Sequence, residues 1–351
     1  MNSNHFSQLE IEGLLGAYSY NLSFQAGRGA SVRFITGPNG FGKTTILYLV
    51  YSLFNQQFEN FGRIEFERLN FVFQDGKSIE IKKTCKPIEQ GVKDSSDLPE
   101  MNYTEQLTVN YRYADGHLST GVVYNLGGTF NDDFNDDFAK RVNDANLRLF
   151  LNSQECYWID ERRLINKSRV SLRRESDTGH PTMVWRSNQM AKEYEKVRFF
   201  LTKDFSVRED VSEQEQKDSE RFLKNLRLFK EVIGSYKFER KTLETVPAYE
   251  GIRFRLKDMK RSIVLPEDLS SGEQQLIDIF YELIFCAPED SLVLIDEPET
   301  SQHLMWQVKF YNNIRKVASN KNLQVIVATH SPQVFDGKWE LCEDLYSQIR
   351  G

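Results

Sequence analysis

Alternation of hydrophobic and polar residues dominates the first third of the chain and predicts short strands. Three alternating runs, separated by glycine-containing turns, occupy residues 9–13, 17–24 and 31–36. Further alternating runs flank two Asp-Gly dipeptides, at Asp75 and Asp115, and Asp-Gly between such runs is a strong hairpin signal. Residues 1–125 are therefore predicted to form an α+β lobe with a strand-rich, antiparallel outer layer.

Continuous apolar runs replace this alternation in the C-terminal third and predict strands that are buried on both faces. Residues 291–298 and 323–331 are runs of this kind, and residues 303–319 between them have helical spacing. Residues 46–54 are apolar on most sides and predict a buried helix, and residues 276–285 predict another. Strand, helix and strand in this order imply a parallel sheet that is covered on both faces.

The middle of the chain, residues 180–240, has the periodicity of amphipathic helices. Two apolar stripes share the same spacing, namely Met190, Tyr194, Val197 and Leu201, and then Phe222, Leu226, Phe229 and Ile233. The polar residues 208–220 between the stripes are typical of a solvated tip. We predict a short helical hairpin within an inserted segment, residues 161–245, between an N-terminal lobe (1–160) and a C-terminal lobe (246–351).

Composition narrows the class of protein. With 351 residues, of which 40% are hydrophobic and 13% aromatic, the chain has enough apolar surface for a large core and is unlike a disordered protein. The formal net charge is −6, which excludes a globally basic nucleic-acid binder. Any contact with DNA or RNA would require a local basic patch. The acidic tandem at residues 131–138 is interpreted as a solvated loop or helix start.

Targeting signals and cysteine usage point to the cytoplasm. The four cysteines are scattered and form no CxxC pair, so neither a disulfide framework nor a zinc site is expected. The N-terminus lacks the basic and apolar segments of a signal peptide. No apolar run approaches the length of a membrane span, which is about 18 residues, and no membrane partner is expected.

The clearest chemical motif is a phosphate-binding loop that follows a predicted strand and opens a predicted helix. Residues 37–44 match G-x-x-x-x-G-K-[ST] completely. The glycines allow backbone amides to surround phosphate oxygens, Lys43 supplies a positive charge, and the Thr44 hydroxyl can bind Mg²⁺. The motif predicts ATP and Mg²⁺ as ligands, and the candidate contacts are Gly37, Pro38, Asn39, Gly40, Phe41, Gly42, Lys43, Thr44 and Thr45.

A second motif places two acids at the end of a buried strand. Four apolar residues, 292–295, precede Asp296 and Glu297. Downstream of a phosphate-binding loop, this arrangement predicts that Asp296 holds Mg²⁺ and that Glu297 orients or deprotonates the attacking water.

A third motif, Leu-Ser-Ser-Gly-Glu-Gln-Gln, begins at Leu269 and resembles the signature motif of ABC-type ATPases, in the form found in the SMC, RecF and OLD branch. The resemblance implies that this segment of one subunit contacts the γ-phosphate bound by another, so a homodimer or higher homo-oligomer is expected. The residues carried over are Ser270, Ser271, Gly272 and Glu273. The same residues also have the S-x-x-E spacing of a helix capping box, and both interpretations can hold together.

The order and spacing of the remaining motifs support this resemblance. His330, at the end of the last apolar strand, matches the family's switch histidine, which contacts the γ-phosphate. Residues 299–303 match the D-loop region, although Gln302 stands where many relatives have Leu. About 230 residues separate Lys43 from Gly272, which is longer than in a compact transporter ATPase and is similar to SMC-like proteins.

Some family features are less certain in this chain. Gln74 and Gln154 are the candidates for the Q-loop glutamine, and neither is favoured. Tyr18 or Tyr20 is a candidate for stacking on adenine, although packing within the sheet is the simpler interpretation. Six cations between Asp160 and Glu175 are candidates for binding nucleic-acid phosphates, or else form a solvated loop with local salt bridges; they are Arg162, Arg163, Lys167, Arg169, Arg173 and Arg174.

The resulting expectation is an α/β protein with the head of an ABC-type P-loop ATPase, a mixed sheet, an antiparallel β-rich outer layer and a short helical-hairpin insertion. Lys43, Glu297 and His330 are the candidate catalytic residues for ATP hydrolysis. The resemblance implies that ATP-dependent dimerisation controls a separate effector protein, a nuclease or toxin, or nucleic-acid binding, as in bacterial anti-phage defence. The alternatives are a RecF-like DNA-repair ATPase, a transporter subunit and an ATP-bound assembly scaffold with little turnover.

Overall fold

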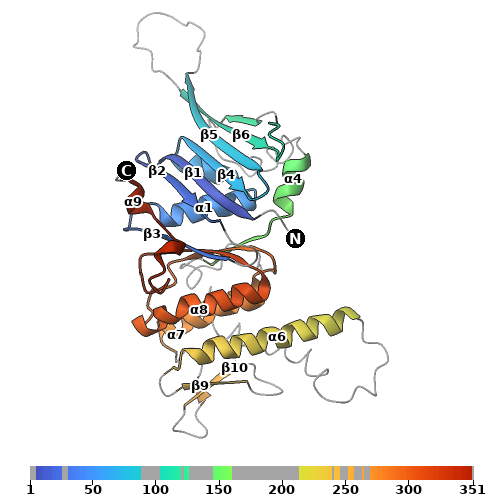
Figure 1. Ribbon diagram of the computed structural model, residues 1–351, viewed down its shortest axis with the longest axis vertical. Coiled ribbons are helices and arrows are strands. Elements are labelled where there is room, and N and C mark those ends of the chain that lie inside the picture. Colours follow the sequence, from blue (N-terminus) through green and yellow to red (C-terminus); the bar gives the residue numbers. More distant parts are fainter. Residues whose placement is uncertain are drawn as a thin grey trace, which may run out of the picture.

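The computed structural model shows a layered α/β fold in which two sheets pack against one central helix (Figure 1). Helix α1 (Lys43–Phe54) lies between an antiparallel sheet and a parallel sheet, and three helices cover the other face of the parallel sheet, namely α6 (Glu213–Ser235), α7 (Ser271–Tyr281) and α8 (Leu304–Lys321). The structure describes residues 5–25, 31–87, 103–119, 122–125, 145–159, 213–238, 241–245, 252–256, 263–264 and 269–349.

The parallel sheet is the centre of the fold. Its described strands have the order β14-β3-β13-β12-β8, and they are β3 (Ser31–Thr36), β8 (Cys156–Ile159), β12 (Leu292–Asp296), β13 (Gln324–Thr329) and β14 (Cys342–Asp344). Alternate side chains of β12 enter two separate cores. Leu292 and Leu294 pack on the side of α1, whereas Val293 and Ile295 pack on the side of α7 and α8. The predicted parallel sheet with two covered faces is confirmed.

The predicted antiparallel outer layer is also confirmed, and it is a sheet of its own. The described strands have the order β2-β1-β4-β5-β6-β7. Both Asp-Gly dipeptides lie in tight turns, where Gly76 N donates to Phe73 O and Gly116 N donates to Tyr113 O. The strands are β1 (Phe6–Leu14), β2 (Tyr18–Ser23), β4 (Arg68–Phe73), β5 (Ser78–Pro87), β6 (Tyr103–Arg112) and β7 (Val122–Asn125), and the short helices α2 (Glu59–Arg63) and α4 (Ala145–Asn152) pack beside α1.

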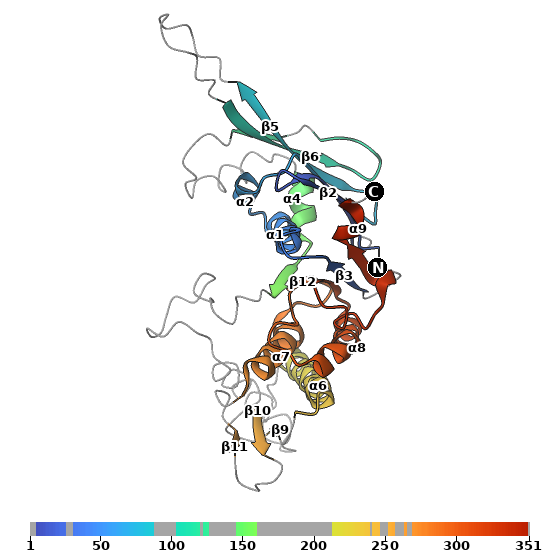
Figure 2. The ribbon, with the colours of Figure 1, turned by 90° about the vertical axis from the view of Figure 1, so that its left-hand side faces the viewer.

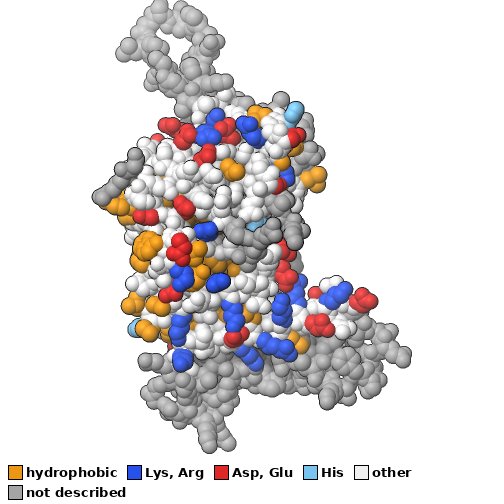
Figure 3. Space-filling view, viewed as in Figure 1, with side chains coloured by type: hydrophobic (Ala, Val, Ile, Leu, Met, Phe, Trp, Pro, Cys, Tyr) orange, Lys and Arg blue, Asp and Glu red, His pale blue; other side chains and the backbone are white. Residues whose placement is uncertain are grey.

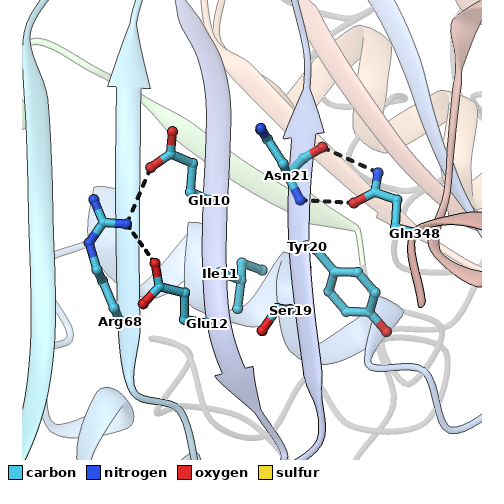
Figure 4. A pocket seen from close by; sticks show the side chains of 8 residues that line it. All are labelled: Glu10, Ile11, Glu12, Ser19, Tyr20, Asn21, Arg68 and Gln348. Carbon is cyan, nitrogen blue, oxygen red and sulfur yellow. Dashed lines mark hydrogen bonds and ion pairs between the residues drawn. The ribbon is translucent and has the colours of Figure 1, made fainter. Parts of the chain in front are cut away.

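The outer face of this sheet carries a polar groove of about 490 Å³ (Figure 4). Within it, Arg68 Nη1 lies 2.9 Å from Glu12 Oε1 and 3.4 Å from Glu10 Oε2. The side chain of Gln348, on helix α9 (Leu345–Ile349), pairs with the backbone of Asn21 at the edge strand β2, accepting from its N–H at 2.8 Å and donating to its carbonyl at 3.2 Å. Gln348 therefore occupies backbone groups through which an exposed edge strand would otherwise pair with another chain.

The predicted helical hairpin is seen in part. Its first stripe, residues 190–201, lies outside the described residues. The second stripe belongs to α6, whose Leu226, Phe229 and Ile233 pack in the core beneath α7 and α8. Residues 213–220, predicted as part of a solvated tip, are instead the first two turns of α6, although most of their described side chains are exposed. The polarity of residues 213–220 indicated that they are exposed, but it did not indicate that they are helical.

A small antiparallel sheet lies below these helices, with the order β11-β10-β9 among the described strands (Figure 2). Its strands are β9 (Lys241–Thr245), β10 (Ile252–Leu256) and β11 (Ile263–Val264).

Charge is distributed unevenly over the surface. Lys and Arg side chains gather over the lower part of the face in Figure 3, where α6 and α8 lie in Figure 1. Helix α8 contributes the partly or fully exposed Lys309, Arg315 and Lys316 and contains no Asp or Glu. A net charge of −6 thus coexists with a basic face on two described helices.

A π-helix, η3 (Glu282–Cys286), ends the segment that begins with α7, and a buried lysine stabilises it. Lys321, at the end of α8, is 4% exposed. Its Nζ donates to the carbonyls of Leu283 at 3.1 Å, Ile284 at 2.9 Å and Ala287. Burial lowers the pKa of Lys321 to about 8. One ammonium group therefore satisfies three carbonyls where the helix changes its hydrogen-bonding pattern.

Replacing this ammonium should destabilise the fold. We expect Lys321→Met to lower the free energy of unfolding at pH 7 by about 2 kcal/mol or more, because buried carbonyls lose charge-assisted donors. Lys316→Met, on the same helix, removes a partly exposed ion pair with Glu231 and should change stability by less than about 1 kcal/mol. Urea titrations of the three proteins measure both differences, and equal stability of all three would contradict the account.

The difference in stability between wild type and Lys321→Met has a predictable pH dependence. The folded-state pKa of Lys321 is about 8 and the ordinary value is 10.5. Between these values the unfolded chain binds the proton and the folded chain does not, so the stability of wild type relative to Lys321→Met should rise as the pH increases through this window. A difference that stays constant from pH 7 to 11 would show that Lys321 keeps its ordinary pKa.

Candidate functional site

The register of the parallel sheet brings the predicted motifs to one edge. Ala328 lies opposite both Ile35 and Asp296, and Thr329 lies opposite Thr36. The segments that follow β3, β12 and β13 therefore all emerge at the carboxyl edge of the sheet, where ligands bind in open α/β folds. These segments contain the phosphate-binding loop, the acidic pair and the switch histidine.

The loop between β3 and α1 has the backbone of a phosphate cradle. Gly40 and Gly42 have φ of 85° and 86°, the left-handed region that glycine adopts without strain. Gly42 is also the N-cap of α1, and a Cβ there would lie 2.9 Å from Leu14 Cδ2. Of the other predicted contacts, Pro38, Asn39, Gly40 and Thr44 are exposed, and Gly37, Phe41 and Thr45 are half-buried.

Lys43 links this loop to the acidic strand. The Lys43 side chain is only 4% exposed. Its Nζ donates to Gly37 O at 2.9 Å and to Pro38 O at 3.2 Å. The same Nζ lies 4.0 Å from Glu297 Oε1. Glu297 follows directly after β12, with its N–H bonded to Ala328 O at 2.9 Å. The φ of Glu297 is 43°, a strained value for a residue with a side chain. Asp296 is buried at the strand end, 5% exposed.

The switch histidine faces two carboxylates. His330 Nδ1 lies 3.0 Å from Glu299 Oε1 and 3.8 Å from Glu297 Oε1. Its side chain is half exposed and lines a cavity of about 540 Å³ together with Glu299, Thr300, Ser301, Gln307, Ser331, Pro332 and Gln333. The structure therefore brings Lys43, Glu297 and His330 together.

Glu299 has a role that sequence reasoning did not assign. Its Oε1 accepts from Thr329 Oγ1 at 2.6 Å, His330 N at 2.7 Å and Ser331 N at 3.2 Å. Burial raises the pKa of the Glu299 carboxyl, and these donors together with the His330 side chain offset part of that rise. The signal in the sequence was the second acid two residues after Glu297, but only the fold shows what it contacts.

The signature residues lie on the other face of the parallel sheet from α1. Ser270 caps α7 in the predicted capping box, with Glu273 N donating to Ser270 Oγ at 3.3 Å and Ser270 N donating to Glu273 Oε2 at 2.8 Å. Lys241, on β9, forms an ion pair with Glu273 at 2.7 Å. Ser270 and Ser271 are exposed, whereas Gly272 is buried.

Gly272 packs directly on the segment after the acidic strand. A Cβ at Gly272 would lie 2.2 Å from Ser301 O, a distance that requires one backbone to move. Ser301 has a φ of 59°. The nearby Gln302, where relatives often have Leu, is buried, and its N–H donates to Glu299 O at 2.9 Å. Glycine at 272 is therefore required for the contact between these two segments.

Aromatic side chains support the phosphate-binding loop from the outer sheet. Tyr20 is 3% exposed and donates to Phe41 O at 3.0 Å, while Tyr18 stacks on Phe41 with ring centroids 5.4 Å apart. Burial, and secondarily the nearby Tyr18, raises the pKa of Tyr20 to about 12, so its hydroxyl stays a neutral donor at physiological pH. Tyr20 packs within the protein, whereas stacking of Tyr18 on adenine stays a prediction.

The candidates for the Q-loop glutamine and for nucleic-acid binding are not among the residues that meet at this site. Gln154 precedes β8. The backbone N–H of Gln74 donates to His5 O, next to the start of β1. Both positions are at the amino edge of the parallel sheet, because Cys156 pairs with Leu292, and Phe6 N donates to Gln324 Oε1 at 3.2 Å. The acidic tandem and the six cations predicted to bind nucleic acid lie outside the described residues; the cations are Arg162, Arg163, Lys167, Arg169, Arg173 and Arg174.

Sequence comparison agrees with this geometry. The family model described as "AAA domain, putative AbiEii toxin, Type IV TA system" matches residues 168–336. The matched region contains the signature segment, the acidic strand and the switch histidine, and the phosphate-binding loop precedes it. Residues 168–336 are therefore similar to this AAA family. This match agrees with the predicted resemblance to an ATP-binding protein of the AAA type.

Solved structures similar to this chain include heads of SMC proteins. One is an SMC head bound to the C-terminal winged-helix domain of ScpA (13% identity, 94% of this chain, 91% of that chain, TM-score 0.46), and another is the SMC head domain from Thermotoga maritima (14%, 97%, 92%, 0.39). No curated protein sequence matches the chain. Within the described residues, no helix has both the length and the apolarity needed to cross a membrane.

The contact between Gly272 and Ser301 gives a prediction with a matched control. We expect Gly272→Ala to displace the signature segment and to reduce ATP turnover by about a hundredfold, because a shift of roughly 1 Å in a positioning element can have that effect. Affinity for a non-hydrolysable ATP analogue, measured on dilute protein, should stay within about threefold, since the phosphate-binding loop is on the other face of the sheet.

The control is Gly234→Ala in α6, where a Cβ meets no atom within 4 Å. It should keep wild-type turnover and gain up to about 1 kcal/mol of stability from the higher helix propensity of alanine. Wild-type turnover by Gly272→Ala would show that the close contact has no bearing on activity.

Proposed function

We propose that this protein binds and hydrolyses ATP at the carboxyl edge of its parallel sheet, in a site completed by a second copy of the chain. The observation that carries the proposal is the convergence of Lys43, Glu297 and His330, with Nζ–Oε1 and Nδ1–Oε1 distances of 4.0 and 3.8 Å. These residues come from segments of the chain that are far apart in sequence, and they meet beside a loop shaped for phosphate.

The residues present fit a bound ATP–Mg²⁺. The amides around Gly40 and Gly42, at the N-terminus of α1, suit the phosphates. Lys43 donates to the carbonyls of Gly37 and Pro38 in this structure, and phosphate oxygens are stronger acceptors for the same ammonium. Thr44, exposed, and Asp296 are the oxygen donors for Mg²⁺. When bound, Mg²⁺ neutralises charge that develops on the phosphates.

The chain's own groups supply the remaining chemistry. Glu297 orients the attacking water and accepts its proton. Lys43 and the imidazole of His330 compensate charge on the terminal phosphate as the bond to it breaks. The cavity of about 540 Å³ beside His330 and Ser301 leaves space next to these groups for a second protein surface.

That surface is the signature segment of another copy. Ser270 and Ser271 are exposed at the start of α7, while α1 and the phosphate-binding loop belong to the opposite face of the sheet. A helix N-terminus with exposed hydroxyls is suited to contact a phosphate, and the family resemblance assigns this contact to the partner subunit. We infer a homodimer, or a higher homo-oligomer, that forms around ATP.

We propose that this ATP-dependent dimerisation controls a separate effector protein, a nuclease or toxin, in anti-phage defence within the cytoplasm. Support comes from the family description, which names a toxin–antitoxin system. Nucleic-acid contact through the cations between Arg162 and Arg174 stays a prediction. A RecF-like repair ATPase would need DNA for turnover, and an assembly scaffold would bind ATP with almost no turnover.

Removal of the Glu297 carboxylate tests the proposed function. We expect Glu297→Gln to reduce phosphate release by about a hundredfold or more, since the water loses its base while ATP binding persists. Light scattering should show that this variant accumulates as an ATP-dependent dimer. Lys43→Ala should lose both ATP affinity and the dimer.

A surface exchange of the same type, Glu340→Gln, is the control, because Glu340 is exposed and remote from these groups. Hydrolysis at the wild-type rate by Glu297→Gln would remove this residue from the mechanism. Wild-type turnover by Lys43→Ala would overturn the assignment of the whole site.

A further inference from the structure

Glu299 is a buried carboxylate that collects the donors of the switch loop on one oxygen. Its side chain is 3% exposed. A hydroxyl and two backbone amides, from three consecutive residues of the loop, donate to Oε1 at 2.6 to 3.2 Å. A carboxylate with this many donors fixes the loop, because three consecutive residues share it as an acceptor.

The imidazole of His330 approaches the same oxygen. Nδ1 lies 3.0 Å from Glu299 Oε1, which is closer than its 3.8 Å distance to Glu297 Oε1. The two carboxylates therefore have different relations to the ring. Glu299 is the nearer and more buried partner, and Glu297 is 23% exposed and also lies 4.0 Å from Lys43 Nζ.

The position of Nδ1 constrains what Nε2 can do. A neutral imidazole with its proton on Nδ1 presents only a lone pair at Nε2, which repels a phosphate oxygen. The imidazolium carries protons on both nitrogens and donates from Nε2. A carboxylate oxygen 3.0 Å from Nδ1 attracts a proton on that nitrogen, so Nε2 donates to a phosphate only when the ring carries both protons.

We propose that Glu299 is the positioning residue of the switch histidine, holding Nδ1 inward so that a protonated Nε2 donates to the terminal phosphate of ATP. This inference rests on the proposed function of the site for its consequence in turnover. Its structural part, the effect of Glu299 on the imidazole, does not depend on ATP.

The contacts of Glu299 also connect His330 with the signature segment. Gln302 N donates to Glu299 O at 2.9 Å, and the neighbouring Ser301 carbonyl is the atom that packs on Gly272. The residue that holds the histidine therefore lies in the same short turn that contacts α7.

The variant Glu299→Gln removes the negative charge of the side chain while keeping its shape. The amide keeps one oxygen acceptor for Thr329 and the loop amides but carries no negative charge. We expect kcat to fall by at least about tenfold, because a charged donor to the transition state is weakened, while KM for ATP–Mg²⁺ stays within about threefold. Asp336→Asn, a matched exchange outside the cavity, removes the charge of an exposed ion pair with Lys338 and should leave both constants within about twofold.

A spectroscopic measurement tests the contact without turnover. Long-range proton–nitrogen correlation spectra of the imidazoles, with the His330 signal assigned by comparison with His330→Gln, report which ring nitrogen carries the proton. Wild type should show protons on both Nδ1 and Nε2, and Glu299→Gln should shift the Nδ1 signal towards the unprotonated position.

The outcomes separate the two proposals. Unchanged imidazole signals in Glu299→Gln, or an unchanged kcat in an active protein, would overturn the role of Glu299. A changed imidazole signal in a wild-type protein that hydrolyses no ATP would support the contact with Glu299 and would overturn the proposed function of the site.

Discussion

The register of β3, β13 and β12 is the constraint on which the rest of the structure depends. Strands β12 and β13 are apolar along most of their length, and the two covered faces hold the sheet between separate cores. Since the strands are parallel and in register, their carboxyl ends coincide. A shift of one residue in β13 would exchange the side chains that face the two cores and would move His330 away from Glu297 and Glu299.

Strain is concentrated at this edge. Glu297 and Ser301 both have left-handed backbone conformations, each of which costs about 1 kcal/mol or more for a residue with a side chain. The segment is held by the bond from Glu297 N to Ala328 O, by the donors to Glu299 and by the contact of Ser301 with Gly272. The turn after β12 thus links the acidic strand, the switch loop and the signature helix. A displacement of one of these elements would therefore displace the others.

Local patterns were sufficient for the parts of the fold whose signal is local. The continuous apolar runs at β12 and β13, the Asp-Gly turns, the phosphate-binding loop and the capping box at Ser270 are all readable from short windows of sequence. Residues 213–220 were misassigned because a polar, exposed first turn of a helix has the same composition as a loop. Spacing along the chain also brought Lys43, Glu297 and His330 into one hypothesis, since motif order is a sequence property.

Contacts between distant segments could not be predicted in this way. Nothing local indicates that Lys321 satisfies the carbonyls of a π-helix, that Gln348 covers the edge of β2, or that Glu299 receives the donors of the switch loop. Each depends on the positions of two elements that are separated by 30 or more residues. Glu299 is the instructive case, because its motif was recognised as a D-loop region while its partner was not.

The central claim is that each ATP site uses residues from two copies of the chain, and mixing two inactive proteins tests it most directly. Lys43→Ala lacks the phosphate-binding half, and Ser271→Arg blocks the exposed signature half without removing the Ser270 cap. An equimolar mixture should recover ATPase activity, up to about half of the wild-type value, because neither variant forms the ATP-dependent dimer with itself and each mixed dimer has one intact site. A mixture no more active than its separate components would contradict the shared site.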